Sequence, residues 1–527
     1  MRKTKAQIRS KAAAAEPPKL WSILKKQAAE FCRETGLHGY KYISQTQRSK
    51  TERIVWALMV FTSLCCAVVL MKMTWNYYAT HPTLTVIEST HHGIWNYPFP
   101  AITVCNINRM SYNLTKEFVD NLEIPANVSK QFLLQEMRLL NELVVPGVFG
   151  YDVRRNLTYL QDIIDHNDLS ILDVMKMITG NCSSLLVTCK WKGVLSPCDK
   201  YFRQSISRDG LCCSFNYYTS PGTITDKIKK SASCGYETGM TILINGEPND
   251  YHASIIGSFG VKVMIHYSFD YPDFNAEIQL IQLNSQYFVS VNPSEMYSKP
   301  EVRNLAISTR KCIFNDEADE LLFRDGKERN LTYTTYTYHN CLAECRATVV
   351  RAKCGCVPFY FPQNSTRICN LRDIHCLQEY QTLFDTSWPG INLTAQKNLP
   401  RTISDVGRRP CGCIPDCSLY HYPIEYSFGK LDPSVYYKNG GFSKNPHNTT
   451  SLRNHSMLHV FFNDLVGFQY RRSVNYSWRN LFASFGGLLG LFAGFSLMSI
   501  FEFLYFFVIR VITDAYFNNS TKHNNAR

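Results

Sequence analysis

The amino-acid sequence predicts an α+β membrane protein in which two transmembrane helices flank a large, disulfide-rich extracellular domain. Two apolar segments predict the helices. Residues 54–71 hold 18 uncharged residues, about the minimum that crosses a hydrocarbon core, and the only charged residue in 482–509 is Glu502. The cysteines predict the domain, since seventeen of the 20 lie between these segments.

Each apolar segment has an alternative interpretation as a buried helix of a soluble domain. Such helices rarely continue this far without a polar face. A cleaved signal peptide is a second alternative for the first segment, but the segment follows about fifty mostly polar residues and is longer than a signal core. We therefore expect two retained spans.

The distribution of basic residues predicts the topology. Residues 1–53 carry thirteen Lys or Arg against four Glu, in a chain of net charge +13. Basic flanks stay cytoplasmic and can contact anionic lipid, so no nucleic-acid partner is expected. The predicted order is a cytoplasmic N-terminal region (1–53), a first transmembrane helix (54–72), an extracellular domain (73–480), a second transmembrane helix (481–509) and a cytoplasmic tail (510–527).

Glycosylation sequons support the extracellular placement, because glycans need a lumenal surface. They lie at Asn113, Asn127, Asn156, Asn181, Asn330, Asn364, Asn392, Asn448, Asn454 and Asn475. An oxidising compartment also favours disulfides among the cysteines. Zinc ligation by Cys-x-Cys pairs is the alternative, and the sequence alone does not fix the pairing.

Periodicity predicts a mixed domain. Strands are expected at 84–88, 101–105, 261–267, 331–338 and 457–462, where β-branched and aromatic residues concentrate or alternate. Helices are expected at 130–143, 159–178, 316–323 and 341–351, where apolar residues have helical spacing.

The second apolar segment carries a stripe of small residues, Ala483, Gly487, Gly490 and Gly494, at steps of three or four. Glycine costs about 1 kcal/mol in a helix, so the stripe needs a reason. One reason is close packing between helices. The other is a narrow pore in which backbone carbonyls and the Ser496 hydroxyl meet an ion. An intramembrane carboxylate at Glu502 favours the pore.

Catalytic motifs are absent from the sequence, so no enzyme activity, metal or cofactor is expected. His266 and His459 are interpreted as hydrogen-bonded strand residues. The acidic residues Asp316, Glu317, Asp319 and Glu320 could sense protons, although a solvated helix face is the simpler interpretation.

Four landmarks resemble those of a known family. They are His38-Gly39 before the first span, Phe99-Pro-Ala-Ile-Thr-Val-Cys105-Asn after it, Gly210-Leu-Cys-Cys-Ser-Phe-Asn216, and Cys411-Gly-Cys-Ile-Pro-Asp-Cys417. Over residues 36–510 the chain resembles the epithelial sodium channel and degenerin family, also called the amiloride-sensitive sodium channel family, and is nearest its insect pickpocket branch.

The resemblance implies roles for the pore residues. Gly494, Phe495 and Ser496 match the selectivity filter, Ala483 matches the degenerin gate position, and His38 with Gly39 matches the gating motif. Gly487, Gly490 and Glu502 are then associated with the pore. Phe495 departs from the small residue common at the middle filter position.

The resemblance also implies a set of disulfides and a hand-like ectodomain. The bridges carried over are Cys105–Cys212, Cys189–Cys198, Cys312–Cys417, Cys341–Cys413, Cys345–Cys411, Cys354–Cys376 and Cys356–Cys369. Of the remaining extracellular cysteines, we expect Cys213 to pair with Cys234 and Cys182 to stay odd.

The function expected from the resemblance is a subunit of a Na⁺-preferring, amiloride-sensitive sensory channel of the plasma membrane. It would form a homo- or heterotrimer with related subunits, conduct Na⁺ without a cofactor, and open when an extracellular chemical or mechanical stimulus pulls on strand 457–462 and so on Ala483. An ATP-gated channel, a non-conducting receptor, adhesion or accessory subunit, and an ecto-enzyme are the alternatives.

Overall fold

The computed structural model describes residues 20–126, 128–147, 151–218, 228–317, 335–361, 366–385, 412–432, 453–475 and 477–513. The chain divides into two compact units. The first, which we call the helical unit, consists of Met1–Leu84 and Val474–Arg527. The second, the disulfide-rich unit, is Thr85–Ser473.

The helical unit contains the first apolar segment in one long helix, α3 (Lys50–Thr80). Ser49 caps it by accepting a hydrogen bond from the Glu52 N–H. Thirty-one residues at about 1.5 Å each span roughly 46 Å, more than the roughly 30 Å of a hydrocarbon core. Its most apolar part has a mean hydropathy of 2.5. The helix starts before and ends after the predicted boundaries of 54 and 72.

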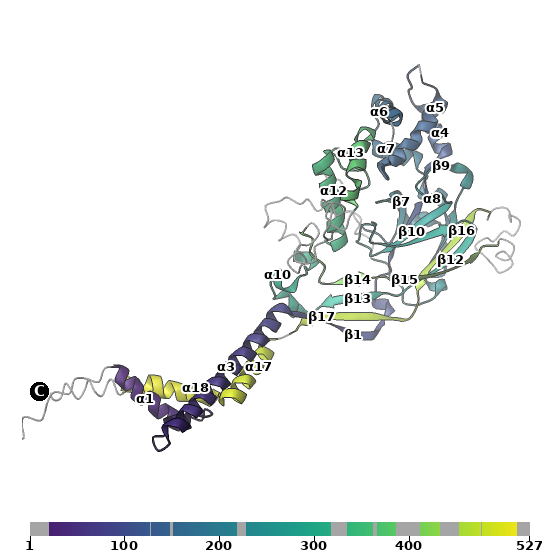
Figure 1. Ribbon diagram of the computed structural model, residues 1–527. Coiled ribbons are helices and arrows are strands. Elements are labelled where there is room, and N and C mark those ends of the chain that lie inside the picture. Colours follow the sequence, from purple (N-terminus) through teal and green to yellow (C-terminus); the bar gives the residue numbers. More distant parts are fainter. Residues whose placement is uncertain are drawn as a thin grey trace, which may run out of the picture. The chain divides into compact units, whose positions relative to one another are not determined.

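The second apolar segment is not the single helix that we predicted over 481–509. Helix α17 (Trp478–Ala493) ends at residue 493, and α18 (Leu497–Leu504) starts after a break and continues as a π-helix, η10 (Tyr505–Ile509). The axes on either side of the break differ by 70°, and the pair is apolar enough to form one broken span. In Figure 1, α17 runs beside α3 and α18 turns away.

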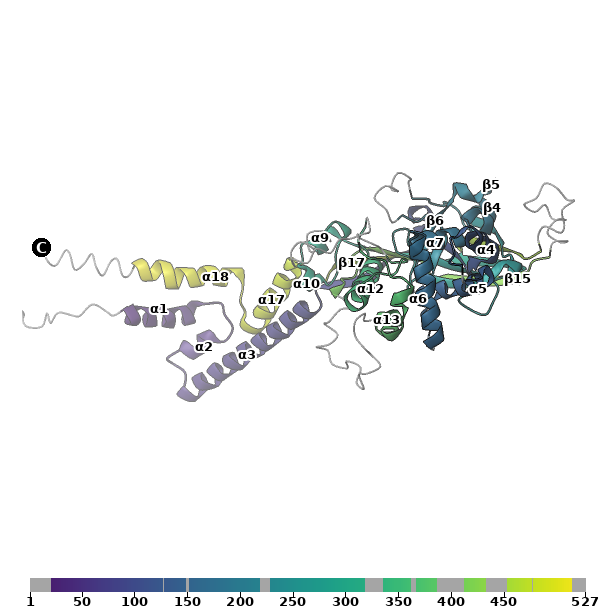
Figure 2. The ribbon, with the colours of Figure 1, turned by 90° about the horizontal axis from the view of Figure 1, so that it is seen from above.

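Shorter helices complete the helical unit. Helix α1 (Leu20–Glu34) lies along α18 and η10, and α2 (Tyr40–Ser44) connects it to α3. Figure 2 shows α1 and α18 side by side. The N-terminal region therefore packs against the second half of the broken span.

The disulfide-rich unit is built on β-sheets. A five-stranded sheet has the order β11 (Glu277–Gln282), β10 (Gly260–His266), β2 (Ala101–Asn106), β7 (Gly210–Phe215) and β6 (Phe202–Ser207). A six-stranded sheet has the order β15 (Ile424–Lys430), β12 (Ser285–Val291), β16 (His455–Phe462), β8 (Met240–Asn245), β4 (Leu186–Trp191) and β5 (Val194–Ser196). Their facing side chains form one core, in which Phe99 packs edge-on against Trp191 and Phe462 at 4.8 and 5.1 Å between ring centroids.

Two smaller sheets belong to the same unit. One has the order β1 (Thr83–Gly93), β17 (Val466–Val474), β13 (Ser294–Ser298) and β14 (Leu419–His421), and the other pairs β3 (Asn108–Ser111) with β9 (Tyr251–Ser254). Along the chain, β1 directly follows α3 and β17 directly precedes α17. The sheet that joins β1 and β17 is therefore covalently continuous with both apolar helices.

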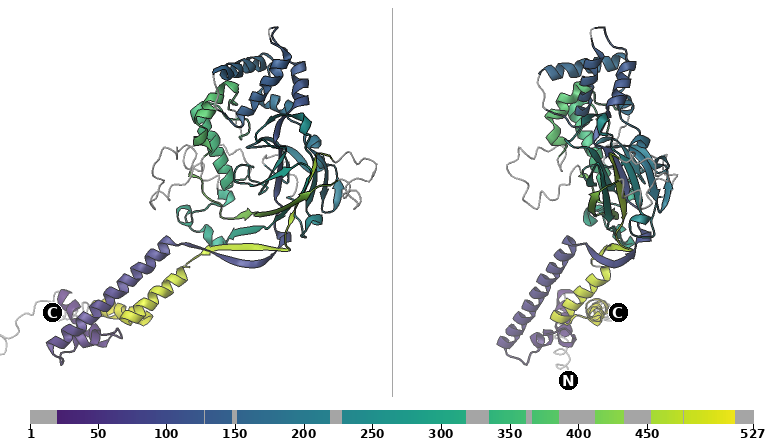
Figure 3. Two further views of the ribbon diagram at one scale, coloured as in Figure 1. Left: turned by 45° about the vertical axis from the view of Figure 1, so that its right-hand side comes forward. Right: turned by 90° about the vertical axis from the view of Figure 1, so that its right-hand side faces the viewer.

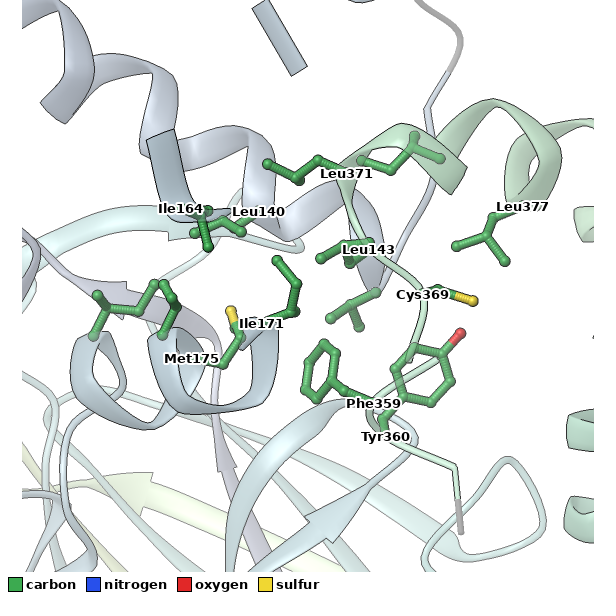
Figure 4. Packing of buried hydrophobic residues seen from close by; sticks show 14 of the residues in the cluster. Leu140, Leu143, Ile164, Ile171, Met175, Phe359, Tyr360, Cys369, Leu371 and Leu377 are labelled. Atoms are coloured by element: carbon green, nitrogen blue, oxygen red, sulfur yellow. The ribbon is translucent and has the colours of Figure 1, made fainter. Parts of the chain in front are cut away.

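A second core lies among helices at the end of the disulfide-rich unit (Figures 1 and 3). It is formed by α4 (Tyr112–Asn121), α5 (Lys130–Glu136), the 3₁₀ helix η2 (Met137–Leu143), α6 (Tyr151–His166), α7 (Ile171–Ile178), α12 (Tyr338–Cys354), η7 (Leu371–Asp373) and α13 (Ile374–Glu379). Figure 4 shows Ile171 and Met175 of α7 directed toward Phe359 and Leu143. Leu211 of β7 also belongs to this core, so the helices pack against the five-stranded sheet.

Most predicted elements are present. Residues 84–88, 101–105 and 457–462 are strands, and 261–266 of the predicted 261–267 are in β10. The helix predicted at 341–351 lies within α12, and 130–143 forms α5 and η2. In 316–323, only 316–317 are described, in a short 3₁₀ helix (Asn315–Glu317).

Two predicted elements were wrong in the described residues. The helix expected over 159–178 is divided into α6 and α7, because Asp168 has a left-handed φ of 52° and Ser170 caps α7 by accepting from Asp173 N–H. The strand expected over 331–338 falls partly outside the described residues, and Tyr338 is the first residue of α12.

The structure contains six of the disulfides that the resemblance implied. They are Cys105–Cys212, Cys189–Cys198, Cys312–Cys417, Cys341–Cys413, Cys354–Cys376 and Cys356–Cys369. The pair Cys345–Cys411 lies outside the described residues because Cys411 is not among them.

The expected pair Cys213–Cys234 was wrong, because Cys213 bonds to Cys182 and Cys234 is a free thiol. Neighbouring side chains on a strand point to opposite faces. Since Cys212 bonds to Cys105 on one face of β7, Cys213 faces the other side. There it shares the core with Cys182 of the short helix α8 (Cys182–Leu185).

Five of the predicted glycosylation sites are described. Asn113 and Asn181 are exposed. The side-chain amide of Asn156 donates to Glu136 Oε2 and that of Asn475 donates to the His81 carbonyl, while Asn454 is half-buried. Asn127, Asn330, Asn364, Asn392 and Asn448 lie outside the described residues. Asn113 and Asn181 are the most accessible acceptors among those described.

Candidate pore segment

Within the described residues, the part of the small-residue stripe that lies in α17, from Ala483 to Gly490, is not used for packing. A Cβ atom added at Gly486 or Gly487 would meet no atom within 4 Å, and one added at Gly490 would meet only the Phe495 carbonyl oxygen at 3.7 Å. Ala483 is also exposed. The contact with α3 uses another part of the helix, where the Ser63 hydroxyl donates to the Phe492 carbonyl at 2.6 Å. The stripe is therefore available to a surface outside this chain.

The break at residues 494–496 follows from local backbone preferences. Gly494 has φ 70°, which is left-handed, and its N–H donates to the Gly490 carbonyl at 2.9 Å, which ends α17. Glycine adopts this conformation at no steric cost and is the usual residue there. Ser496 is extended and starts α18 through reciprocal hydrogen bonds with Ser499. Glycine followed closely by serine thus separates two helices inside an apolar segment.

The His38-Gly39 pair contacts this break. The His38 N–H donates to the Ala493 carbonyl at 3.0 Å, and a Cβ at Gly494 would lie 2.7 Å from His38 Cδ2. Gly39 has φ 83°, and a Cβ there would lie 2.6 Å from Val60 Cγ2 of α3. Two glycines therefore allow the N-terminal segment to approach both apolar helices closely. The structure brings the His38-Gly39 pair beside Gly494, which is far from the pair in the sequence.

Glu502 of α18 has a partner in the N-terminal segment. The Thr35 hydroxyl donates to Glu502 Oε2 at 2.9 Å. A carboxylate inside an apolar segment is expected to face a partner or water, and Thr35 supplies that partner. Glu502 is therefore held beside the end of α1.

Further contacts between α1 and the second half of the broken span were not predicted. Phe31 packs edge-on against Phe506 and Phe507, with ring centroids 5.7 and 5.4 Å apart. Arg510 donates to Glu30 at 2.8 Å. The aromatic Phe31 within a basic segment was the signal available in the sequence, but nothing local indicates its partners.

The break at residues 494–496 lies between the ends of two helices. The C-terminal end of a helix carries a partial negative charge of about half an elementary charge. The Ala493 and Phe492 carbonyls at this end already accept hydrogen bonds from His38 and Ser63. The backbone of residues 494–496 and the exposed Ser496 side chain lie immediately beyond it. The N-terminal end of α18 at Leu497 carries the opposite partial charge, so the Ser496 hydroxyl oxygen, rather than a net helix charge, is what the break offers to a cation.

The acidic cluster considered as a proton sensor is partly engaged in ion pairs. Asp316 accepts from Arg303 at 2.6 and 3.0 Å, and Glu317 pairs with Arg310. The hydrogen bond from Arg303 lowers the pKa of Asp316. Asp319 and Glu320 lie outside the described residues. Asp316 therefore stays ionised near neutral pH.

The two strand histidines are hydrogen-bonded, as expected. His266 bonds to Thr103 Oγ1 at 2.8 Å, and His459 bonds to Thr241 Oγ1 at 2.9 Å. Burial lowers the pKa of each to about 4. Both are neutral at physiological pH.

Comparison with known proteins agrees with the resemblance. A family profile described as amiloride-sensitive sodium channel matches residues 31–506. Sodium channel protein Nach of Drosophila melanogaster is 24% identical over 505 residues, covering 92% of this chain and 88% of the relative. Pickpocket protein 28 of the same species is 23% identical over 526 residues, covering 93% of this chain and 79% of the relative.

A vertebrate relative is equally similar. The bile acid-sensitive ion channel of Mus musculus is 25% identical over 488 residues, covering 92% of this chain and 88% of the relative. A cryo-EM structure of a proton-activated chloride channel covers 90% of this chain and 98% of that chain, but its TM-score of 0.26 and 7% identity carry no argument. The profile match extends over most of the chain, and the chain belongs to the amiloride-sensitive sodium channel family.

Proposed function

We propose that the chain is a subunit of a Na⁺-preferring, amiloride-sensitive cation channel of the plasma membrane, with both termini cytoplasmic. The observation that carries the proposal is the interruption of the apolar segment at residues 494–496, where the backbone leaves the helical conformation and the Ser496 side chain is exposed. Gly494, Phe495 and Ser496 act as the filter. Na⁺ loses part of its hydration shell there to backbone carbonyls and the Ser496 hydroxyl.

The channel forms by association of three copies or of this chain with two related subunits. Ala483, Gly487 and Gly490 of the stripe support this assembly, because among the described residues no atom outside the helix backbone lies within 4 Å of a Cβ at Gly487 and only one backbone oxygen approaches a Cβ at Gly490. Small residues permit close approach of neighbouring helices around an axis. In the assembled channel α17 lines the pore.

Gating is assigned to both ends of α17. Ala483 is the gate position near its start, and a small side chain there allows closure. His38 and Gly39 hold its other end through the Ala493 carbonyl and the Gly494 contact. An extracellular chemical or mechanical stimulus, in a sensory setting, reaches α17 through β17, which precedes it in the chain.

Ion-substitution recording tests the filter. The full-length chain is expressed alone and with related subunits, and reversal potentials are measured in Na⁺ and K⁺ with and without amiloride. Ser496→Ala is expected to reduce the Na⁺ to K⁺ permeability ratio. Ser484→Ala is the matched control, because the Ser484 hydroxyl donates to the Asn480 carbonyl within α17. An unchanged ratio in Ser496→Ala would contradict the filter assignment.

A second candidate function is a non-conducting accessory or receptor subunit of a heteromeric channel. Phe495 favours it, because a side chain this large at the middle filter position is 37% exposed in the chain. Phe495→Ser distinguishes the two functions. Current from the variant alone, with none from the natural chain under the same stimuli, would support the accessory role.

A further inference from the structure

A cavity of about 470 Å³ lies in the disulfide-rich unit, between the start of α12 and the strands β13 and β14. Its wall includes Asp270, His339, Asp416, Tyr267, Tyr338 and Tyr420. Pockets for small organic molecules have volumes of roughly 300–1,000 Å³. The cavity is therefore large enough for such a molecule and much larger than a single metal ion requires.

Three polar atoms on this wall lack hydrogen-bond partners within the described part of the chain. They are Asp270 Oδ1, His339 Nδ1 and Asp416 Oδ1. Asp416 is only 7% exposed, and its other carboxylate oxygen accepts from the Tyr338 N–H at 3.0 Å. A buried polar atom without a partner costs about 1–3 kcal/mol, so the wall favours a bound hydrogen-bond donor.

No lysine or arginine lines the cavity among the described residues. Glu295, also on the wall, is already engaged, since it accepts from Tyr420 at 3.0 Å and Gln469 at 2.9 Å and lies 3.9 Å from His92 Nε2. Asp270 accepts a hydrogen bond from Thr337, and in the described part of the chain neither Asp270 nor Asp416 forms an ion pair with a lysine or arginine. Burial raises the pKa of each to about 7. A bound cation would supply the missing positive charge.

Aromatic rings stand beside the two carboxylates. Tyr267 and Tyr420 lie with ring centroids 5.4 Å apart. Ring faces attract cations and also accept hydrocarbon groups. Carboxylates together with aromatic rings suit an organic ammonium ion better than a bare metal ion.

We propose that this cavity binds a small organic cation of the primary amine class. The ammonium group donates to Asp270 and Asp416, and the hydrocarbon part lies against Tyr267 and Tyr420. The site is separate from residues 494–496. It involves β13 and β14, which belong to the same sheet as β1 and β17.

Calorimetric binding to the purified full-length protein in lipid nanodiscs tests the site. The probes are methylamine, butylamine and 2-phenylethylamine, with 2-phenylethanol as the neutral counterpart of the last. At pH 7.5 at least one amine is expected to bind with Kd below about 1 mM, and the alcohol is not. Lowering the pH to 5.5 should weaken amine binding about tenfold or more, because the carboxylates become protonated below their pKa.

Titratable groups on every element around Asp270 and Asp416 can also influence how amine binding depends on pH. They are His266, Tyr267, Asp273 and Glu295 on the strands and adjoining loops, His339 and Arg346 on α12, and Tyr420 and His421 on β14. Burial keeps the pKa of His266 and His339 below the ordinary value. Neither therefore competes as a cation at pH 7.5.

Substitutions identify the site. Asp270→Asn and Asp416→Asn should each reduce amine affinity at least tenfold, and thermal unfolding of each variant checks that it folds. Asp168→Asn is the matched control, because Asp168 is exposed in the loop between α6 and α7 and its φ of 52° suits asparagine. Equal binding of 2-phenylethanol, unchanged affinity in either folded pocket variant, binding of Zn²⁺ without any amine, or no binding by any amine would overturn the proposal.

Discussion

Gly494→Ala tests the contact between the N-terminal segment and the helix break most directly. A left-handed backbone costs an L-residue about 1–2 kcal/mol. The new Cβ would also lie 2.7 Å from His38 Cδ2, and overpacking of this kind costs about 1–3 kcal/mol. Because the left-handed strain acts on the end of α17 whether or not His38 is docked, only the overpacking term shifts docking; it destabilises the docked His38 segment by about 1–3 kcal/mol, which lowers its docked-to-undocked ratio at least about fivefold.

Limited proteolysis of the purified full-length protein measures this ratio. Trypsin can cleave at Lys41 and Arg48 when the segment between α1 and α3 leaves its site. Cleavage tracks the open population when opening and closing are fast. The rate for Gly494→Ala should therefore rise at least about fivefold under conditions in which cleavage, rather than opening, is the slow step.

The double variant His38→Ala/Gly494→Ala separates the two terms. Removal of the His38 ring relieves the overpacking but not the left-handed strain. The double variant should therefore be cleaved more slowly than Gly494→Ala, with a coupling energy of about 1–3 kcal/mol. Gly36→Ala is the control, because a Cβ there meets nothing within 4 Å. An unchanged cleavage rate in Gly494→Ala, or no recovery in the double variant, would refute the reasoning.

Three further outcomes are expected. Ala483→Val should give a standing current in voltage-clamped cells, because a larger side chain at the gate opposes closure; a surface-expressed variant without standing current would contradict the gate assignment. Non-reducing peptide mapping should recover Cys182 linked to Cys213 and Cys345 linked to Cys411; free thiols at 345 and 411 would refute the second pair. The pKa of Asp270 is about 7 in the folded protein and about 4 unfolded, so the folded state binds more protons between these values and the thermal unfolding temperature should rise as pH falls from 7.5 to 5. Asp270→Asn should reduce that rise, and an identical pH profile would exclude the contribution of Asp270.

The positions of some strands were predictable from the sequence, because nearly all side chains of these strands lie in the same buried environment. Residues 101–105 and 457–462 are rich in β-branched and aromatic residues, and both segments are buried on both faces. The two apolar segments were predictable for the same reason, since their composition alone favours a hydrocarbon environment over water. Helix boundaries within 481–509 were harder to predict, because a long apolar segment has the same composition whether its helix is continuous or broken.

The local signals for the two helix breaks were present but weak. Asn167 to Ser170 combine a left-handed Asp168 with a serine cap, and Gly494 to Ser496 combine a left-handed glycine with a serine cap. Each signal also occurs inside uninterrupted helices. The free Cys234 was missed because pairing depends on which strand face each cysteine occupies, and that register is set by sheet partners far away in the sequence.

The contacts of the pore segment explain why its members are so dispersed along the chain. In an apolar medium, carbonyls at an interrupted helix need donors from elsewhere in the protein. Ser63 supplies one from α3 and His38 supplies another from the N-terminal segment, while Thr35 binds Glu502 across a separation of 467 residues. The interrupted apolar segment is therefore stabilised by contacts from both the first apolar helix and the N-terminal segment, so loss of either should weaken the packing around residues 494–496.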